Sequence, residues 1–320
     1  DFARTHPAFT YKNDTLQLRT GVTLFSGVTY LPAGTRVVIP AGATLLMAPE
    51  ASIISYSPVQ VRGTKTQPVT IRAQKAAQPW GVFAVFNTKE VSEVAHLKIS
   101  GGGEYQHAGV PISGMLAFHG APAHIATSTF SGATGDDALN VKDAWTHIHG
   151  STFANNTSDA VDLDYVDPDS ELHGNEFLSN EGNNGDAIDL SWANVTIRDN
   201  LVLSCGDKGI SVGESSQPTI TGNVIARCTI GVAVKDSSVV DIHDNVFIEN
   251  TEAVSLYQKK RFFSGGTATI SDNVFFNDTT QFVTDAASTL TEGDNLVLQE
   301  RTQLETHLSA DHVARLFGGR

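Results

Sequence analysis

Hydrophobic and polar positions alternate in a six-residue phrase that recurs six times along the middle of the chain. Each copy has a usually polar residue, a small residue, and then two aliphatic residues separated by one variable, mostly polar position. Because side chains alternate between the two faces of a strand, the phrase predicts a short strand whose aliphatic residues, such as Leu139 and Val141, point inward. The copies are residues 137–142, 159–164, 186–191, 208–213, 230–235 and 252–257.

A second phrase begins with an aliphatic residue, ends five residues later with a hydrophobe, and recurs seven times between residues 125 and 275. Its starts are 22 to 28 residues apart, by subtraction of their numbers, and two short strands in such a period are typical of one solenoid coil. The third position after the start is Ser in two copies and Asn in five. We expect this Asn to adopt the left-handed conformation and to hydrogen-bond the amide of its stacked neighbour. The starts are Ile125, Ile148, Leu172, Ile197, Ile220, Ile242 and Ile270.

The rest of the chain predicts further strands and a helical end. Residues 37–39, 44–47, 52–55, 69–71 and 82–86 form strand-like runs between Gly and Pro turns. Residues 302–318 predict an amphipathic cap with Ser309 as N-cap, because the end of a solenoid exposes apolar core. We therefore expect one all-β domain, residues 1–320, folded as a parallel β-helix of about ten or more coils with a short C-terminal helical cap. Its parts are an N-terminal cap with the first coils (1–93), regular coils (94–280) and the C-terminal cap (281–320).

The formal net charge of −14 narrows the expected partners. With 35 acidic and 21 basic residues, the chain lacks the basic excess that nucleic acids and anionic membranes require. No apolar run approaches the ~18 residues of a membrane span. Cys205 and Cys228 occupy equivalent positions on adjacent coils, ~4.8 Å apart, which permits a disulfide; a stacked pair of buried thiols fits at least as well.

Stacking of the coils predicts two acidic columns. Carboxylates ~5 Å apart repel by roughly 3 kcal/mol per pair at an effective dielectric constant of 20, so these groups either retain protons or hold a cation. Their oxygens suit Ca2+, with Asp136, Asp164, Ser191 or Asn184 completing the shell. The alternative is that each Asp caps backbone amides at a turn and faces water. The columns are Asp137, Asp159 and Asp186, and Asn140, Asp162 and Asp189.

Lysines follow the acidic columns on the next coils. Lys208 takes the position that Asp fills on earlier coils. Beside a cation-bound sugar carboxylate, Lys208 can serve as a general base. Alternatively, it can end the column in a salt bridge to Asp186 or Asp207. Lys235, one coil further, can hold a substrate anion or form a surface ion pair with Glu214 or Asp236.

Aromatic residues and one insertion lie next to these columns. Tyr165, Trp192 and Tyr257 follow the same strands outward, where they can stack on sugar rings or pack on a neighbouring coil. The insertion at residues 101–111 can overhang the columns with Glu104, Tyr105 and His107. No pair of histidines has a helical metal-ligand spacing, and His147 and His149 are expected to point outward from one strand.

Residues 94–280 resemble the pectin-lyase-like β-helix superfamily, and the right-handed sense of the helix is an implication of this resemblance. Residues 157–159, 185–186, 207–209 and 233–235 are similar to the motifs of polygalacturonase-type hydrolases. However, Lys208 replaces a His, Gly185 an Asp and Ala233 an Arg, which argues against hydrolysis by that family's mechanism.

Residues 156–163 and 137–142 also look like segments of the calcium-dependent β-helix polysaccharide lyases. This resemblance implies that Asp137, Asp159 and Asp162 bind Ca2+ and that Lys208 is the base.

These observations lead to the hypothesis of a monomeric, secreted or periplasmic enzyme that cleaves an acidic polysaccharide by calcium-assisted β-elimination. Lys208 would remove the proton, and Tyr165 or water would protonate the leaving oxygen. Two alternatives remain open: a glycoside hydrolase that uses paired Asp residues such as Asp162 and Asp189, and a non-catalytic carbohydrate-binding module. The expected Ca2+ ligands are Asp137, Asp159, Asp162, Asp164, Asp186 and Asp189, and the expected substrate contacts are Lys235, Trp192, Tyr257, Glu214 and Lys142.

Overall fold

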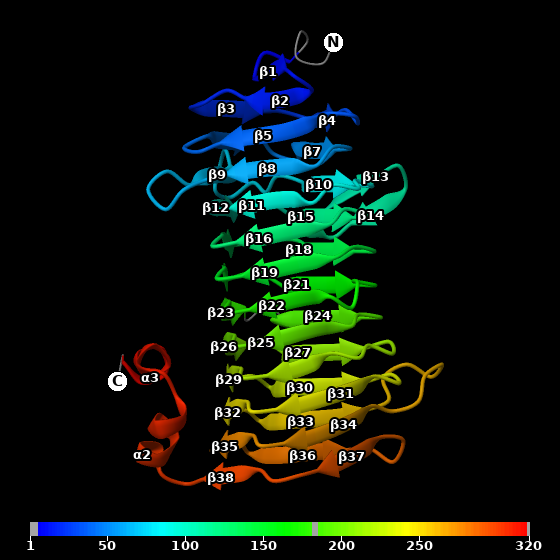
Figure 1. The fold of residues 1–320 in the computed structure, drawn as a ribbon, viewed down its shortest axis with the longest axis vertical. Helices are drawn as coiled ribbons and strands as arrows, with labels where there is room; N and C mark the ends of the chain where they lie inside the picture. The colour runs from blue at the N-terminus through cyan, green and yellow to red at the C-terminus, as the bar shows by residue number, and fades with distance from the viewer. Residues whose placement is uncertain (1–5, 181–184, 319–320) are drawn as a thin grey trace.

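The computed structural model describes residues 6–180 and 185–318. The chain winds into a parallel β-solenoid of about 12 turns that runs from the N-terminal hairpin at one end to β38 at the other (Figure 1). The predicted all-β solenoid is therefore confirmed. Among the described helices, none is both long and apolar enough to cross a membrane.

Three long sheets form the sides of the solenoid, with 13, 11 and 12 strands in the described part of the chain. The thirteen-stranded sheet contains β1 (Phe9–Lys12), β2 (Thr15–Leu18), β5 (Arg36–Pro40), β8 (Val59–Arg62), β11 (Ser92–Ala95), β16 (Ala123–Ala126), β19 (Thr146–His149), β22 (Ser170–His173), β25 (Val195–Arg198), β28 (Thr219–Thr221), β31 (Val239–His243), β34 (Thr267–Ser271) and β37 (Thr289–Glu292). The eleven-stranded sheet contains β4 (Val28–Leu31), β7 (Ser52–Ser55), β10 (Phe83–Phe86), β15 (Gly114–His119), β18 (Asp137–Lys142), β21 (Asp159–Asp164), β24 (Ile188–Ser191), β27 (Lys208–Gly213), β30 (Ile230–Lys235), β33 (Glu252–Tyr257) and β36 (Thr280–Thr284). The twelve-stranded sheet contains β3 (Val22–Phe25), β6 (Thr44–Met47), β9 (Val69–Ala73), β12 (Leu97–Ser100), β17 (Thr129–Ser131), β20 (Thr152–Ala154), β23 (Glu176–Asn180), β26 (Leu201–Cys205), β29 (Val224–Ala226), β32 (Val246–Ile248), β35 (Val274–Phe276) and β38 (Leu296–Leu298).

The inside of the solenoid is one continuous apolar core. The aliphatic positions of the repeated phrase, including Leu139 and Val141, are fully buried as predicted. Phe130, Phe153 and Phe177 stack on successive coils with ring centroids 4.6 and 5.1 Å apart. Each coil alone has too little apolar surface to bury, so the stacking of like residues is what stabilises the array.

A ladder of buried asparagines joins the coils at one turn. The backbone N–H of Asn200 donates to Asn223 Oδ1 at 3.0 Å, and that of Asn223 donates to Asn245 Oδ1 at 2.9 Å. The predicted hydrogen bonds are thus present, but the expected left-handed conformation is wrong for the Asn itself. The chain reverses one residue earlier, at Asp199 and Gly222, where φ is 55° and 69°. This leaves the Asn side chain free to point along the stack inside the turn.

A second turn carries a similar ladder that is interrupted by a disulfide. Asn180 Oδ1 accepts from the Asn156 backbone N–H at 3.1 Å, and Asn250 Oδ1 accepts from the Cys228 backbone N–H at 3.0 Å. Between these rungs, Cys205 and Cys228 form a disulfide with a Cα–Cα distance of 4.7 Å. The disulfide therefore replaces two asparagine rungs and resolves the alternative that the sequence left open.

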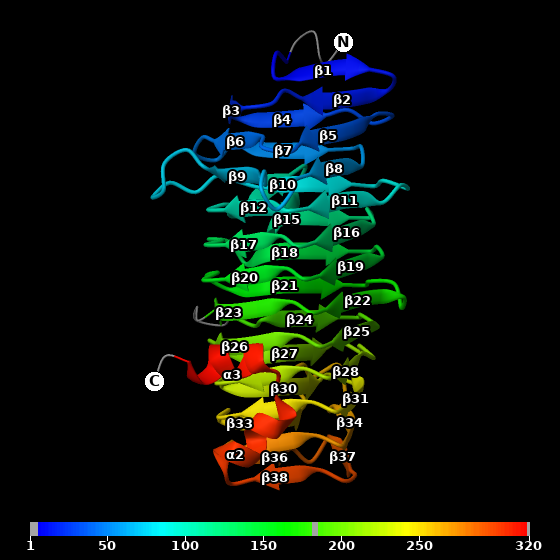
Figure 2. The same cartoon turned by 60° about the vertical axis from the view of Figure 1, so that its left-hand side comes forward.

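The C-terminal helices are present but lie elsewhere than expected. They are α2 (Arg301–Leu304), a 3-10 turn η1 (Glu305–His307) and α3 (Ala310–Phe317). Ser309 is the N-cap of α3, since its Oγ accepts from the His312 backbone N–H at 3.1 Å. The helices run back along the outer face of the twelve-stranded sheet and do not form the expected cover over the solenoid end (Figure 2). That outer face needs a cover because its outward positions are apolar, namely Leu201, Val224, Val246 and Val274.

Candidate functional site

The predicted columns lie on the outer face of the eleven-stranded sheet. Asp137 pairs in register with Asp159, and Asp162 pairs with Asp189. The first column continues by hydrogen bonds, because Asp159 Oδ1 accepts from the Asp186 backbone N–H at 2.8 Å. In the same way, Asp186 Oδ1 accepts from the Lys208 backbone N–H at 3.0 Å. The repeat register alone therefore predicted which residues stack.

These polar side chains are more buried than an outward-facing position suggests. Asp137 has an exposed fraction of 2% and Lys208 of 6%. Asp137 lies in register between Gly114 and Asp159, and Lys208 lies between Asp186 and Ile230 on the neighbouring coils. The two columns, with Lys208 at the end of the first, form what we call the acidic ladder, a set of partly desolvated titratable groups.

Burial and mutual repulsion raise the pKa of the stacked carboxyl groups. Burial is the main cause that raises the pKa of Asp137 to about 8. A hydrogen bond with Ser113 lowers this pKa, and the negative charge of Asp136 raises it further. Burial and the charge of Asp186 raise the pKa of Asp159 to about 9. The pKa of Asp162 is also raised well above its ordinary value, first by burial. Without a bound cation, Asp137 and Asp159 retain their protons at neutral pH.

The raised pKa of Asp159 predicts that stability depends on pH. Below the ordinary pKa of 3.8, this carboxyl is protonated in both the folded and the unfolded chain. Between about pH 4 and 9 the unfolded chain loses the proton while the folded protein keeps it. The folded state then binds more protons, so the free energy of unfolding falls as pH rises.

Asp159→Asn keeps the acceptor for the Asp186 amide and removes the ionisation. In the presence of a chelator, we expect this variant to be more stable than the wild type at pH 8 by on the order of 2 kcal/mol, and nearly equal to it at pH 4. Urea unfolding at the two pH values measures the difference. Asp272→Asn, at an exposed turn, is the matched control; equal pH dependence of both variants and wild type would contradict the prediction.

Three carboxylates form a group that fits a hard cation. One oxygen from each of Asp159, Asp186 and Asp189 lies within 4.8 Å of the others. Asp189 Oδ1 is buried without a hydrogen-bond partner, as is Asp137 Oδ2. An all-oxygen donor set with orphaned acceptors suits Ca2+.

The other expected ligands have protein partners. Asp162 Oδ2 accepts from Asn140 Nδ2 at 2.9 Å, and Asp164 Oδ2 lies 3.3 Å from Lys142 Nζ. The alternative shell residue Asn184 lies outside the described residues.

Lys208 forms both of the ion pairs considered for it. Its Nζ lies 3.3 Å from Asp186 Oδ1 and also contacts Asp207. Burial alone would lower the pKa of Lys208, but the two carboxylates outweigh it, and the net pKa is raised. In the free protein Lys208 is therefore an ammonium group.

Lys235 is buried against the ladder. Its Nζ donates to Ser211 Oγ at 2.7 Å and lies 3.8 Å from Asp189 Oδ1. This ion pair differs from the surface pair with Glu214 or Asp236 that the sequence suggested. Tyr257 lies beside Lys235 in register and is half-buried. Burial raises the pKa of Tyr257, and the charges of Lys208 and Lys235 oppose that change.

An aromatic ledge borders the ladder where the strands end. The rings of Tyr165 and Trp192 are 6.0 Å apart with an interplanar angle of 6°, and their exposed fractions are 48% and 44%. Lys142 Nζ lies 5.7 Å from the Tyr165 ring, and Phe263 packs edge-on against Trp192 at 5.8 Å. The contacts of Tyr165 thus place it in the ledge with Trp192.

The hairpin of β13 (Tyr105–His107) and β14 (Val110–Ile112) overhangs the first coils of the ladder. Glu104 Oε1 accepts from the Asp136 backbone N–H at 3.1 Å. A cavity of about 380 Å³ separates the hairpin from Lys142 and Asp164. His107 instead packs against Tyr56, whose hydroxyl is 2.7 Å from its Nε2.

A second overhang is the loop of residues 258–266. Figure 1 shows this loop and the hairpin projecting from the same side of the solenoid. Glu214, expected to contact substrate, accepts from Ser191 Oγ at 2.7 Å and contacts Lys260. Glu214 therefore holds the loop of residues 258–266 against the solenoid through its contact with Lys260.

Sequence reasoning missed Ser211, His119 and Lys260. Ser211 follows Asp162 and Asp189 in register, so alignment of the repeats contained the signal. His119 Nε2 lies 2.7 Å from Asn140 Oδ1, one coil before the first copy of the phrase. Lys260 comes from an irregular loop and reaches Glu214 across two coils, a contact for which the repeat carries no signal.

Comparison with known proteins identifies the family to which this fold belongs. The model of the family described as "Right handed beta helix region" matches residues 123–297, more than half of the chain. The chain therefore belongs to the right-handed β-helix family, and the predicted resemblance and handedness are confirmed. A search of curated protein sequences found no match.

Several solved structures share the fold at low sequence identity. The periplasmic alginate epimerase AlgG is 12% identical with a TM-score of 0.56, covering 92% of this chain and 80% of its own. A hyperthermoactive exopolygalacturonase from Thermotoga maritima is 10% identical with a TM-score of 0.56, covering 88% and 84%. The tailspike protein of E. coli bacteriophage HK620, solved with a pentasaccharide, is 9% identical with a TM-score of 0.53, covering 90% and 59%. At these identities the likeness establishes the fold.

Proposed function

We propose that this protein is a secreted or periplasmic enzyme that cleaves an acidic polysaccharide by β-elimination on the outer face of the eleven-stranded sheet. One observation carries the proposal. The clustered carboxyl groups of Asp159, Asp186 and Asp189 lie next to two ammonium groups, because Lys208 pairs with Asp186 and Lys235 with Asp189. Three of the solved structures with this fold are named for, or solved with, carbohydrates.

A uronate polymer fits the charge and shape of this face. The face lies between two overhanging segments and carries the Tyr165–Trp192 ledge, whose exposed rings suit the apolar face of a sugar. Lys142 at one end and Lys235 near the centre offer positive charge to carboxylate groups. The net charge of −14 disfavours a polyanion unless a cation reduces the repulsion.

Asp159, Asp186 and Asp189 would hold Ca2+, which supplies neutralisation of the uronate carboxylate and so acidifies the hydrogen on the adjacent carbon. Lys235 would hold the substrate anion from the next coils. Tyr165 and Trp192 would orient the sugar rings. Removal of the acidified hydrogen then requires a basic group on this face.

Lys208 is the proposed base under one condition. As long as Asp186 and Asp207 both face it, its pKa stays raised and it keeps its proton. Binding must therefore draw Asp186 away from Lys208 before Lys208 can accept a proton. Tyr257, half-buried near both lysines, is the second candidate for proton transfer.

A retaining glycoside hydrolase is the second candidate function. Asp159, neutral at pH 7, can donate a proton, whereas Asp186, with a pKa of about 6, is ionised. One oxygen of Asp159 lies within 4.8 Å of one oxygen of Asp186, so the two groups are close enough to act on the same bond, as the acid and nucleophile of retaining enzymes do.

The test is incubation of the wild type with a panel of polyuronates and neutral polysaccharides. A lyase releases an unsaturated product that absorbs in the ultraviolet, and each cleavage also creates a new reducing end. New reducing ends without absorbance would identify a hydrolase. Binding without either signal would identify a carbohydrate-binding module and overturn the proposed reaction.

Trp192→Ala removes the larger ring of the aromatic ledge. We expect the KM for a polyuronate to rise about tenfold, in line with the loss of one aromatic–sugar contact, while kcat changes less. Steady-state kinetics on an oligosaccharide of fixed length measure both constants. Phe262→Ala, at a nearly fully exposed loop position, is the matched control, and an equal effect of both variants would contradict a stacking role for Trp192.

A further inference from the structure

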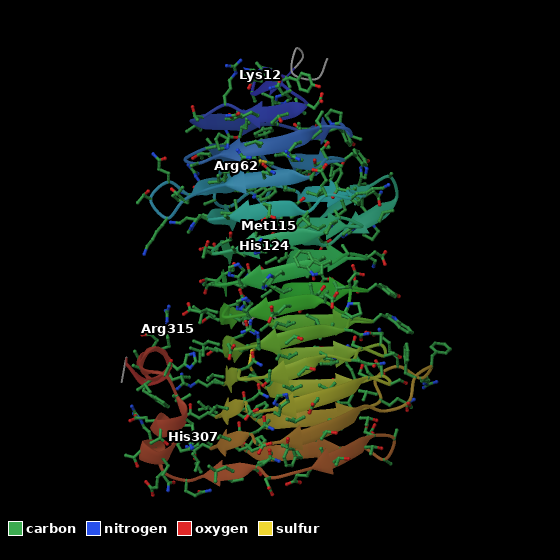
Figure 3. The ribbon with its side chains drawn as sticks, in the orientation of Figure 1. Lys12, Arg62, Met115, His124, His307 and Arg315 are labelled. Carbon is green, nitrogen blue, oxygen red and sulfur yellow. A yellow bond between two sulfur atoms is a disulfide. The ribbon has the colours of Figure 1, made fainter. Side chains whose placement is uncertain are left out.

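A stack of histidine rings lies on the outer face of the thirteen-stranded sheet, away from the acidic ladder. His124 on β16 pairs in register with His147 on β19, and His149 on β19 pairs with His173 on β22, so the four rings form two adjacent columns on three successive coils. Neighbouring ring centroids are 5.0 to 5.2 Å apart. Figure 3 marks His124, the first ring of the stack.

Within this stack, three side chains bring metal-binding atoms together. His147 pairs in register with Glu171, and His173 is two residues further along β22, on the same face. One ligand atom from each of His147, Glu171 and His173 lies within 4.8 Å of the others. We propose that these three residues form a binding site for a divalent transition metal such as Zn2+.

The geometry between His147 and Glu171 already approaches that of a metal centre. His147 Nε2 lies 3.3 Å from Glu171 Oε2. Two ligand atoms of a tetrahedral zinc site are also about 3.3 Å apart, as follows from metal–ligand distances of ~2.0–2.1 Å. Nε2 of His147 is nevertheless buried without a hydrogen-bond partner. A metal ion would satisfy it.

The surroundings of the three residues agree with this assignment. Glu171 Oε1 contacts Arg198, which fixes the carboxylate and leaves Oε2 toward His147. The His149 ring lies flat against that of His173, at 4° between planes, and orients it.

The ligand types determine the class of metal. Two imidazole nitrogens and one carboxylate oxygen suit Zn2+ and its neighbours and do not suit Ca2+, which prefers oxygen alone. A tetrahedral ion bound by three protein side chains keeps one position for water. Because His147 belongs to one coil and the other two ligands to the next, the ion would cross-link adjacent coils.

The test is calorimetric titration of the tag-free full chain with Zn2+, together with thermal unfolding with and without the ion. We expect one high-affinity equivalent and a rise in Tm with Zn2+. His147→Asn and His173→Asn are each expected to weaken the affinity at least tenfold and to remove the rise in Tm. Glu171→Gln, which keeps the size of the side chain, is expected to weaken binding as well and provides a further test if a histidine variant folds poorly.

Two controls locate the site. His307→Asn, at an exposed position in η1, and Asp189→Asn, in the acidic ladder, are both expected to retain the wild-type affinity for Zn2+. Absence of Zn2+ binding by the wild type, or retained affinity in His147→Asn with His173→Asn, would overturn the proposal. Loss of binding in Asp189→Asn would assign the ion to the ladder and overturn it equally.

Discussion

Asn223→Ala is expected to lower the free energy of unfolding by about 3 kcal/mol. Asn223 is fully buried, and its Oδ1 accepts from the backbone N–H and Nδ2 of Asn200 at 3.0 and 2.9 Å. Its Nδ2 also donates to the Ile197 carbonyl at 2.9 Å. Alanine leaves these buried groups without partners, at about 1–3 kcal/mol for each unsatisfied group.

Urea unfolding followed by circular dichroism measures this loss. Asn194→Ala is the matched control, because Asn194 is partly exposed and accepts one hydrogen bond, from the Gln217 backbone N–H at 3.0 Å. We expect a loss of less than about 1 kcal/mol for the control. Equal losses for the two variants would contradict a structural role of the asparagine ladder.

Lys208→Ala is expected to lower kcat/KM for the cleaved polysaccharide by at least about 100-fold, because the variant lacks the proposed base. Lys208→Arg keeps the positive charge toward Asp186 and Asp207 but cannot accept a proton at neutral pH. We therefore expect the arginine variant to fold like the wild type and to be as inactive as the alanine variant. Steady-state rates of both variants provide the measurement.

Lys259→Ala, at an exposed loop position, is the control and should keep the wild-type rate. Full activity of Lys208→Arg would show that Lys208 acts through its charge and would transfer the role of base to another group. A parallel measurement on Tyr257→Phe then decides whether the Tyr257 hydroxyl moves the proton.

The repeat register determined most of the fold, because it depends on local alternation and on like residues stacking. It aligned Asp137 with Asp159 and Asp162 with Asp189 correctly. The position of α3 could not be predicted in this way, since it depends on which outer face has apolar outward positions. Which outer face is apolar can be recognised only once the strands are assigned to the three sheets.

Burial and long-range contacts limited the prediction of the site. The sequence indicated which carboxylates stack, but not that Lys208 would be almost fully buried between Asp186 and Asp207. The link between Glu214 and Lys260 depends on how an irregular loop folds back. The stacking of His124 on His147, in contrast, follows from the repeat, because each of them precedes an aligned isoleucine; metal-ligand spacings typical of helices do not reveal it.

The most direct test of the central claim compares wild type with the double variant Asp162→Asn and Asp189→Asn on one polyuronate. The unsaturated product is followed by ultraviolet absorbance, with Ca2+ and with a chelator, while calorimetry measures Ca2+ binding to both proteins. Our account predicts a rising signal in wild type that the chelator abolishes, and neither signal nor tight Ca2+ binding in the double variant. Equal product formation by the two proteins would contradict the assignment of the acidic ladder as the active site.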